Sequence, residues 1–227
     1  MRNCDFTLIE KYMLETMDDS AHDKEHIYRV LYTALDIARS EANVDYDVLI
    51  TACLLHDIGR KEQYDNPALC HAAVGAEKAS SFLQKNGFDR EFAERVGSCI
   101  ATHRFRSGHP PVTIEEKILF DADKIDATGT LGIARTIFYQ GYVGEPLYTL
   151  DPEGEVSDGS GDSEASFFHE YKHKLEGLYS RFFTKRGGEI AQERQHSAVA
   201  FYRSMLEEVA SSYEKGMTLL RDKIVDK

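Results

Sequence analysis

Apolar residues recur at intervals of three and four positions through most of the chain, and this spacing limits its fold more than any other feature. Such a period places apolar side chains on one face of an α-helix, where they pack against other helices. Proline, which interrupts helices, occurs only five times in 227 residues. The sequence therefore predicts an almost entirely α-helical protein.

Capping and helix-breaking residues indicate where these helices begin and end. Asp45 and Asp89 each precede an apolar helical set, and Asn66-Pro67 combines a cap with a proline suited to a first helical turn. The expected helices are 5–18, 23–42, 45–58, 67–86, 89–104, 113–127, 128–140, 163–182 and 186–224, with a break in the last near Ser211 to Gly216.

Residues 141–162, GYVGEPLYTLDPEGEVSDGSGD, depart from the helical period. This stretch is longer than the usual loop of a compact domain, and it is either a mobile lid or a local excursion of the chain. Nothing else suggests a domain boundary. We expect a single domain over 1–227, with a core of about 22–140 and C-terminal helices over 163–224 that pack on it.

The balance of charge and the cysteines restrict the partners and the compartment. With 39 acidic and 27 basic residues the formal net charge is −12, and such a surface repels nucleic acid duplexes and anionic lipids. No stretch reaches the roughly 18 consecutive apolar residues of a membrane helix, and the N-terminus lacks a secretory signal core. The four cysteines form no CxxC pair and indicate free thiols in a reducing compartment. We expect a cytoplasmic protein with no membrane partner.

Side chains of the metal-binding type follow apolar helical segments. In LLHDIG, His56 and Asp57 stand side by side at the expected end of a helix. Asp123 follows a second apolar run and lies between Asp121 and Asp126; three carboxylates this close repel one another, and a cation would relieve the repulsion. Mixed imidazole and carboxylate ligands suit a borderline divalent ion better than Ca²⁺.

Each of these residues also has an ordinary structural explanation. A single histidine such as His26 is often a surface or hydrogen-bonded residue, and a helix C-terminus favours a structural histidine such as His56. The aspartates Asp121, Asp123 and Asp126 would then lie on a solvated helix face. Their joint occurrence is what favours a metal site.

The order His26, then His56-Asp57, then Asp123 resembles the H…HD…D signature of the HD-domain superfamily of metal-dependent phosphohydrolases. The surrounding segments are similar to those of stand-alone bacterial HD hydrolases; they are HIYRV, ACLLHDIG, CHAAVGAEKA, IATH and KILFDADKIDATGTLGIAR. The C-terminal helices of that group resemble FFHEYKHKLEGLYSRFFTKRGGEIAQER, so the similarity covers roughly residues 22–205. The GYP triplet of the cyclic-dinucleotide phosphodiesterase branch is absent, which argues against that substrate.

The resemblance implies an all-α HD-domain helical bundle with additional C-terminal helices. The implied ligands of one divalent ion (Mn, Ni, Mg, Co, Fe or Zn) are His26, His56, Asp57 and Asp123. His71 and His103 lie where two-metal members carry extra histidines; they either bind a second ion or are cap or core histidines.

The implied function is a metal-dependent phosphohydrolase that acts on a small phosphorylated, nucleotide-like substrate through a metal-activated water. Asp57 is the expected general base, because a carboxylate ligand can also accept a proton from that water. The alternative is a metal- or nucleotide-binding HD regulatory module with little turnover. The presence of all four ligand positions favours the enzyme.

Basic residues near the ligands are candidates for phosphate contacts. Arg29, one helical turn from His26, and Lys124, adjacent to Asp123, are the candidates for a catalytic role, although Lys124 has nearby aspartates as alternative partners. The candidates for substrate binding are Arg60, Arg104 and Arg135, with Lys61 and Arg106 beside the first two. The alternative for all of them is a solvated surface charge.

Two apolar groups have two interpretations each. The aromatic residues near the long loop either stack on a nucleobase or belong to the core; they are Phe138, Tyr139, Tyr142 and Tyr148. Apolar residues of the C-terminal helices either form a homodimer surface or complete the core; they are Phe182, Phe183, Val199, Phe201 and Met205.

Overall fold

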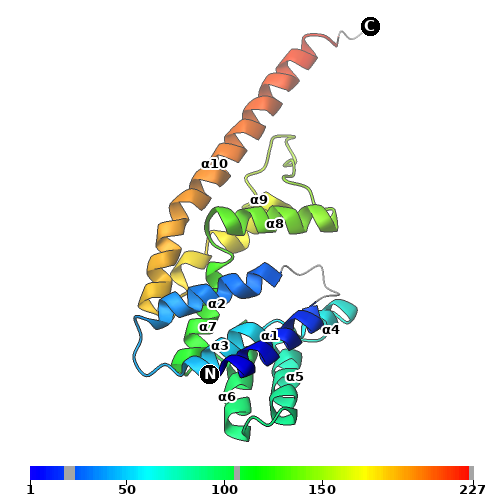
Figure 1. Ribbon diagram of the computed structural model, residues 1–227. Coiled ribbons are helices and arrows are strands. Elements are labelled where there is room, and N and C mark those ends of the chain that lie inside the picture. Colours follow the sequence, from blue (N-terminus) through cyan, green and yellow to red (C-terminus); the bar gives the residue numbers. More distant parts are fainter. Residues whose placement is uncertain (18–23, 105–107, 225–227) are drawn as a thin grey trace. The chain divides into compact units, whose positions relative to one another are not determined.

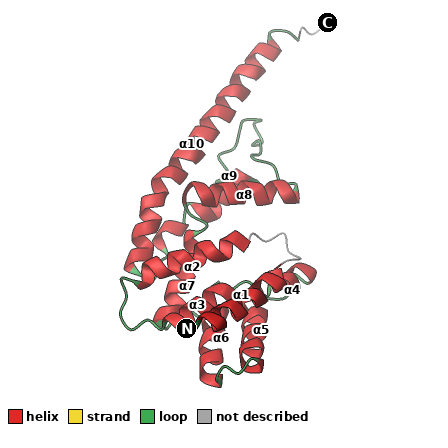
Figure 2. Cartoon of the chain, in the orientation of Figure 1, coloured by secondary structure: helices red, strands yellow, loops and turns green. Residues whose placement is uncertain are grey.

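The computed structural model describes residues 1–17, 24–104 and 108–224, and most of them are helical (Figures 1 and 2). No β-strand occurs among these residues, and one isolated bridge pairs Leu150 with Val156. The predicted all-α class is confirmed. None of the described helices is both long and apolar enough to cross a membrane.

The chain forms two compact units. The first comprises residues 1–126 and 182–187, and the second comprises residues 127–181 and 188–227. The single domain expected over 1–227 stays a prediction, and the units are considered separately below.

The first unit is built around a buried helix. Its helices are α1 (Asn3–Met17), α2 (Lys24–Ala38), α3 (Tyr46–Leu55), α4 (Arg60–Asp65), α5 (His71–Lys85), α6 (Arg90–Thr102) and α7 (Ile114–Ile125). Helix α3 contacts α1, α2, α6 and α7, and its residues from Val48 to Leu55 are buried apart from Ile50. A helix that is apolar on all sides is typical of a protein interior. His56 and Asp57, which follow α3 directly, are therefore delivered into the core.

Side-chain caps define the starts of the helices around this core. Asp45 and Asp89 accept hydrogen bonds from the first-turn N–H groups of α3 and α6, as predicted. At the start of α7, Thr113 and Glu116 form a reciprocal capping box. These caps fix the starts of three helices whose C-terminal ends carry candidate ligands.

The predicted helix over 67–86 was wrong at its start. Helix α5 begins at His71, because the Asn66 side chain accepts a hydrogen bond from the N–H of Ala68 and forms a turn that competes with a helix. Residues 60–65 form the short helix α4, which was not predicted. His71 is consequently the first residue of α5 rather than a residue in its second turn.

The second unit contains α8 (Gly129–Val143), α9 (Phe167–Glu170), a π-helical turn (Tyr171–Leu175), a 3-10 turn (Leu178–Ser180) and the part of α10 (Lys185–Arg221) that follows residue 187. Its core is an apolar cluster that includes Phe167, Phe168, Tyr171 and Tyr202. The regular helix expected over 163–182 is wrong: Ser166 caps the four-residue helix α9, and the π-helical and 3-10 turns that follow bury Tyr171, Leu175 and Leu178. Of the C-terminal apolar residues with two interpretations, Met205 packs against this cluster as the core interpretation predicted, whereas Phe183 and Phe201 are exposed.

Helix α10 continues without a break through residues 211–216, so the predicted break was wrong. Gly216 costs a helix only about 1 kcal/mol, which is not enough to end it. The loop after α8 is ordered by its own hydrogen bonds, since Asp162 accepts from the hydroxyls of Thr149 and Ser157. A lid function of this loop stays a prediction.

Candidate metal centre

Six side chains of the metal-binding type converge inside the first unit, and each comes from the end of a helix. They are His26 in the first turn of α2, His56 and Asp57 after α3, His71 at the start of α5, His103 after α6 and Asp123 in the last turn of α7. All are buried except Asp123, whose side chain is 23% exposed. The residues predicted from the sequence are therefore brought together.

The first group contains His26, His56, Asp123 and one oxygen of Asp57. His26 Nε2 lies 3.3 Å from His56 Nε2, 3.2 Å from Asp123 Oδ1 and 3.6 Å from Asp57 Oδ2. His56 Nε2 lies 3.7 Å from Asp57 Oδ2 and 3.8 Å from Asp123 Oδ1. Ligand atoms about 2.1 Å from a common ion lie roughly 3.0–3.4 Å apart, so these separations suit one ion after small adjustments.

The second group contains His71, His103 and the other oxygen of Asp57. Asp57 Oδ1 lies 3.3 Å from His71 Nε2 and 3.7 Å from His103 Nε2, and the two imidazole nitrogens are 3.2 Å apart. This oxygen is buried without a hydrogen bond, although Arg60 Nε forms an ion pair with it at 2.9 Å. Buried carboxylate oxygens normally have a hydrogen-bond or ligand partner. The Asp57 carboxylate thus lies between two groups, with one oxygen directed at each.

Main-chain carbonyls orient two of the four imidazoles. His56 Nδ1 donates to the carbonyl of Cys53 at 2.8 Å, and His103 Nδ1 donates to the carbonyl of Ile100 at 2.6 Å. Because a carbonyl only accepts, the proton of each neutral ring is on Nδ1, and the lone pair of Nε2 is directed into the site.

Side chains orient the other two imidazoles. Asp126 Oδ2 lies 2.7 Å from His26 Nδ1, and Gln63 Oε1 lies 2.7 Å from His71 Nδ1. Arg104 also approaches His71 Nδ1, at 2.9 Å, and lies 3.3 Å from Gln63 Oε1. A ligand role for His71 requires its Nδ1–H to donate to Gln63, with Arg104 donating to the same amide oxygen.

The surroundings of the imidazoles favour neutral rings in the second group and a protonated His26 ring in the first group. Burial lowers the pKa of His71 to about 2 and that of His103 to about 4, and Arg60 contributes at His71. Burial opposes a charge on His26, but hydrogen bonds to Asp123 and Asp126 raise its pKa to about 9. Protons and metal ions therefore compete for His26.

Both carboxylates at the centre are held in the ionised form. Burial would raise the pKa of Asp57, but the neighbouring His56 and Arg60 lower it well below its usual range. The pKa of Asp123 is also lowered against burial, mainly by its contact with His26. Ionised carboxylates are the form that binds metal.

The sequence suggested that one cation relieves the repulsion among Asp121, Asp123 and Asp126. The structure contradicts this, because the three carboxylates are not directed at one site. Asp121 accepts hydrogen bonds from the backbone of Phe183 and Thr184 and from the Thr184 hydroxyl, and Asp126 pairs with α2. Only Asp123 belongs to a ligand group. Asp123 and Asp126 are three residues apart and therefore share one face of the helix, where they contact opposite nitrogens of the His26 ring, whereas Asp121 points elsewhere.

The basic candidates differ in their surroundings. Arg29 donates to both oxygens of Asp126 at 2.8 and 3.1 Å, so it contacts the site through that carboxylate. The Lys124 ammonium lies 4.5 Å from the centre of the Phe120 ring. Arg60 and Arg104 contact the second group as described above, and Lys61 is exposed. Arg135 belongs to the second unit, and Arg106 lies outside the described residues.

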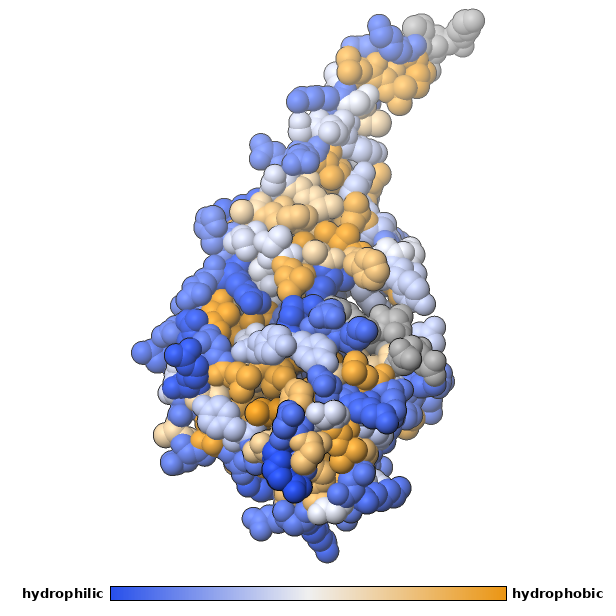
Figure 3. All heavy atoms as spheres, viewed as in Figure 1, coloured by the Kyte–Doolittle hydropathy of each residue, from blue (hydrophilic) through white to orange (hydrophobic). Residues whose placement is uncertain are grey.

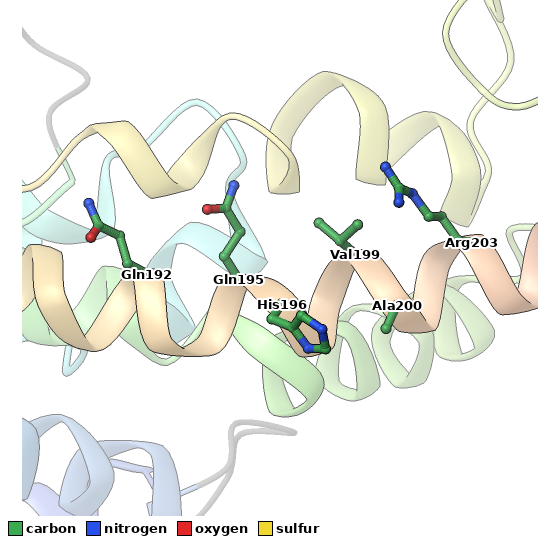
Figure 4. Close-up of a pocket in the computed structure, with 6 residues that line it drawn as sticks. All are labelled: Gln192, Gln195, His196, Val199, Ala200 and Arg203. Atoms are coloured by element: carbon green, nitrogen blue, oxygen red, sulfur yellow. The ribbon is translucent and has the colours of Figure 1, made fainter.

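The aromatic candidates lie in the second unit. Phe138, Tyr139 and Tyr142 are exposed, which contradicts the core interpretation for these three, whereas Tyr148 packs against the apolar core cluster as that interpretation predicted. A cavity of about 360 Å³ in the same unit is lined by Gln192, Gln195, His196, Val199, Ala200 and Arg203 of α10 (Figure 4). It contains none of the predicted ligand or basic residues.

Comparisons with known proteins place the chain in a family. A family model described as HD domain matches residues 24–128, which include all six ligand-type residues. The Bacillus subtilis protein YpgQ is 30% identical over 198 residues, which are 86% of this chain and 87% of that protein. The chain belongs to the HD-domain superfamily. The family match confirms the resemblance that the sequence motifs indicated, and the helical fold of this HD-domain protein agrees with it.

Two solved structures resemble the chain over most of its length. The structure of Bacillus subtilis YpgQ in complex with ADP aligns with a TM-score of 0.70 at 28% identity, covering 90% of this chain and 97% of that one. A predicted HD superfamily hydrolase from an uncultured Thermotogales bacterium aligns with a TM-score of 0.59 at 30% identity, covering 91% and 92%. The chain thus has the fold of HD superfamily hydrolases.

Sequence reasoning missed the groups that orient the imidazoles of this HD-domain site. Gln63 lies in the short helix α4, which no breaker or capping residue in the sequence indicates, so its contact with His71 was not predicted. The carbonyl acceptors of His56 and His103 lie three residues before each ring. A histidine just after a helix often bonds to such a carbonyl, so this contact was predictable.

Proposed function

We propose that this HD-domain protein is a metal-dependent phosphohydrolase that acts on a small phosphorylated, nucleotide-like substrate. The observation that carries the proposal is the pair of ligand groups that share the carboxylate of Asp57. The ADP complex of YpgQ supports a nucleotide-like ligand, and the hydrolase name of the Thermotogales relative supports the reaction class.

The chemistry of the donor set fits divalent metal ions. One ion would be held by His26, His56, Asp57 and Asp123, and a second by His71, His103 and Asp57. Two features support this assignment: the imidazoles direct their Nε2 lone pairs inward, and one oxygen of Asp57 is buried without a hydrogen bond. Imidazole with carboxylate suits Mn, Fe, Co, Ni or Zn, and carboxylates with water suit Mg.

A divalent ion in such a site lowers the pKa of bound water and polarises a phosphoryl oxygen. Asp57 is ionised and central, so it is our candidate to accept a proton during attack by water. Asp123 is the most exposed of the six ligand-type residues, so the substrate approaches on its side. Arg60 and Arg29 are each about one third exposed, and their guanidinium groups supply positive charge near this region.

The roles of the basic residues follow from their contacts. Arg29 orients His26 by holding Asp126, which makes it a positioning residue in this proposal. Arg60 and Arg104 lie against the second group, where a phosphate oxygen can accept from them. Lys124 keeps its candidate catalytic role because its residue is adjacent to Asp123.

The test is elemental analysis of protein purified without chelator, followed by a panel of nucleotides with added Mn²⁺, Ni²⁺, Mg²⁺ or Co²⁺. We expect Asp57→Asn to lose bound metal and to lower kcat at least about 100-fold, which is about 2.7 kcal/mol. Asp36→Asn is the control, because Asp36 is 44% exposed, pairs with Arg186 and contacts no ligand group.

Two outcomes contradict the proposal. An Asp57→Asn protein that remains loaded with metal and turns over at the normal rate removes the role of the shared carboxylate. Nucleotide binding without turnover across the whole panel supports the regulatory module instead of the enzyme.

A further inference from the structure

Arg60 contacts the oxygen of Asp57 that belongs to the second ligand group. Arg60 Nε lies 2.9 Å from Asp57 Oδ1, and the same oxygen lies 3.3 Å from His71 Nε2. Asp57 Oδ1 is buried and makes no hydrogen bond to a described residue, so its contact with Arg60 is an ion pair without hydrogen-bond geometry. A carboxylate oxygen has more than one lone pair, and this one is also directed at two imidazoles. Arg60 and a metal ion would therefore meet at the same oxygen.

The backbone that carries Arg60 is fixed, whereas the end of its side chain is partly open to solvent. The N–H of Arg60 donates to the carbonyl of Asp57 at 3.0 Å, and the Lys78 ammonium donates to the carbonyl of Ile58 at 2.8 Å. The Arg60 side chain is 30% exposed, and that of Asp57 is 3% exposed. The guanidinium can thus leave Asp57 by side-chain rotation, without movement of α4.

The two ligand groups differ in charge. The first contains Asp123 in addition to one oxygen of Asp57, whereas among the described residues Asp57 supplies the only carboxylate of the second. Two guanidinium groups border the second group, because Arg60 contacts Asp57 and Arg104 lies 2.9 Å from His71 Nδ1. A divalent ion in the second group therefore has less carboxylate charge beside it and more positive charge than an ion in the first.

We propose that Arg60 competes with the second divalent ion for Asp57 Oδ1 and so keeps the second group weaker for metal than the first. This inference rests on the proposed function, because it requires both groups to bind metal. An ion about 2.1 Å from Asp57 Oδ1 would lie at most about 5 Å from Arg60 Nε, since 2.9 Å separates Nε from this oxygen. Repulsion between a dication and a single positive charge at that distance weakens binding at least about tenfold, even with the dielectric constant of bulk water.

Titration calorimetry of the full chain with Mn²⁺ alone tests the proposal. The wild type should bind one ion per chain tightly and a second ion at least about tenfold more weakly. Arg60→Gln should bind the second ion at least about tenfold more tightly than the wild type, because glutamine retains a hydrogen-bond donor but carries no charge. Arg60→Lys retains the charge, so its second ion should bind about as weakly as that of the wild type.

Two controls assign the effect to this contact. Hydrophilic residues are spread over the face of the molecule in view (Figure 3), and the formal net charge is −12, so loss of any positive charge increases the general attraction of Mn²⁺. Lys61→Gln removes the same charge from an exposed residue of α4, and it should leave both affinities nearly unchanged. His103→Gln, added to Arg60→Gln, removes a ligand of the second group alone and should abolish the gain.

The outcomes separate this inference from the proposed function. An Arg60→Gln protein whose second ion binds no more tightly than that of the wild type overturns the inference alone. The same holds for a wild-type chain that binds two ions with equal affinity, and for a gain of equal size in Lys61→Gln or Arg60→Lys. Absence of Mn²⁺ binding in both the wild type and Arg60→Gln overturns the inference together with the proposed function.

Discussion

Asp126→Asn isolates the role of a residue that orients a ligand without binding the metal itself. Asp126 is buried, lies 2.7 Å from His26 Nδ1 and accepts two hydrogen bonds from Arg29. Asparagine has nearly the same shape but only one acceptor oxygen and no charge. The variant therefore cannot serve both His26 and Arg29 as the carboxylate does.

The expected magnitude follows from these contacts. Loss of a group that orients a histidine ligand lowers metal affinity about 10–100-fold, which is roughly 1.4–2.7 kcal/mol. The Asp126 carboxylate also stabilises the metal-free protein through its contacts with His26 and Arg29, because a hydrogen bond to a charged group contributes about 1.5–3 kcal/mol. We expect the free energy of unfolding of the metal-free Asp126→Asn protein to be lower than that of the wild type by about this amount, and we expect the variant still to fold.

Titration calorimetry with Mn²⁺, in parallel with urea unfolding of the metal-free protein, measures the two effects separately. Asp36→Asn again serves as the control, since it removes a carboxylate of the same unit that is distant from the ligands. An Asp126→Asn protein that is folded and binds Mn²⁺ with wild-type affinity would refute the argument that Asp126 orients His26 for metal binding.

Two further predictions concern stability. Gly59→Ala should destabilise the protein by about 1–3 kcal/mol in urea unfolding, because an added Cβ would overlap the backbone of His71 and lie 2.7 Å from the nitrogen of Gly75; an unchanged midpoint argues against this close packing. Asp45→Ala should cost about 1 kcal/mol at neutral pH through loss of its cap. Backbone hydrogen bonds and Arg95 lower the pKa of Asp45 in the folded state despite partial burial, so its contribution is complete above the ordinary pKa and disappears as the pH falls through the lowered value. A cost for Asp45→Ala that stays constant down to about pH 2 is inconsistent with that linkage.

Much of the fold was predictable because helical period and caps are local properties. Asp45 and Asp89 cap helices where the sequence placed them. The errors arose where tertiary packing or side-chain turns decide the backbone. The turn at Asn66 delays α5, and the burial of Tyr171 and Leu175 accompanies a π-helical turn where a regular helix was expected.

The candidate ligands were predictable as residue types, but their division into two groups was not. Nothing in the dipeptide His56-Asp57 indicates that the two oxygens of one carboxylate are directed at different sets of imidazoles. That arrangement depends on how α5 and α6 pack against the end of α3, which no local pattern specifies. The same holds for Asp126, which appeared to be one of three equivalent carboxylates until its contact with His26 was seen.

The four imidazoles differ in how vulnerable their orientation is to mutation. The rings of His56 and His103 are held by main-chain carbonyls, which any amino acid at those positions supplies. The rings of His26 and His71 depend on one particular side chain each, Asp126 and Gln63. Among related chains, substitutions that retune the centre without touching a ligand should therefore concentrate at the two side-chain supports, while the positions of Cys53 and Ile100 are free to drift among residues of similar size.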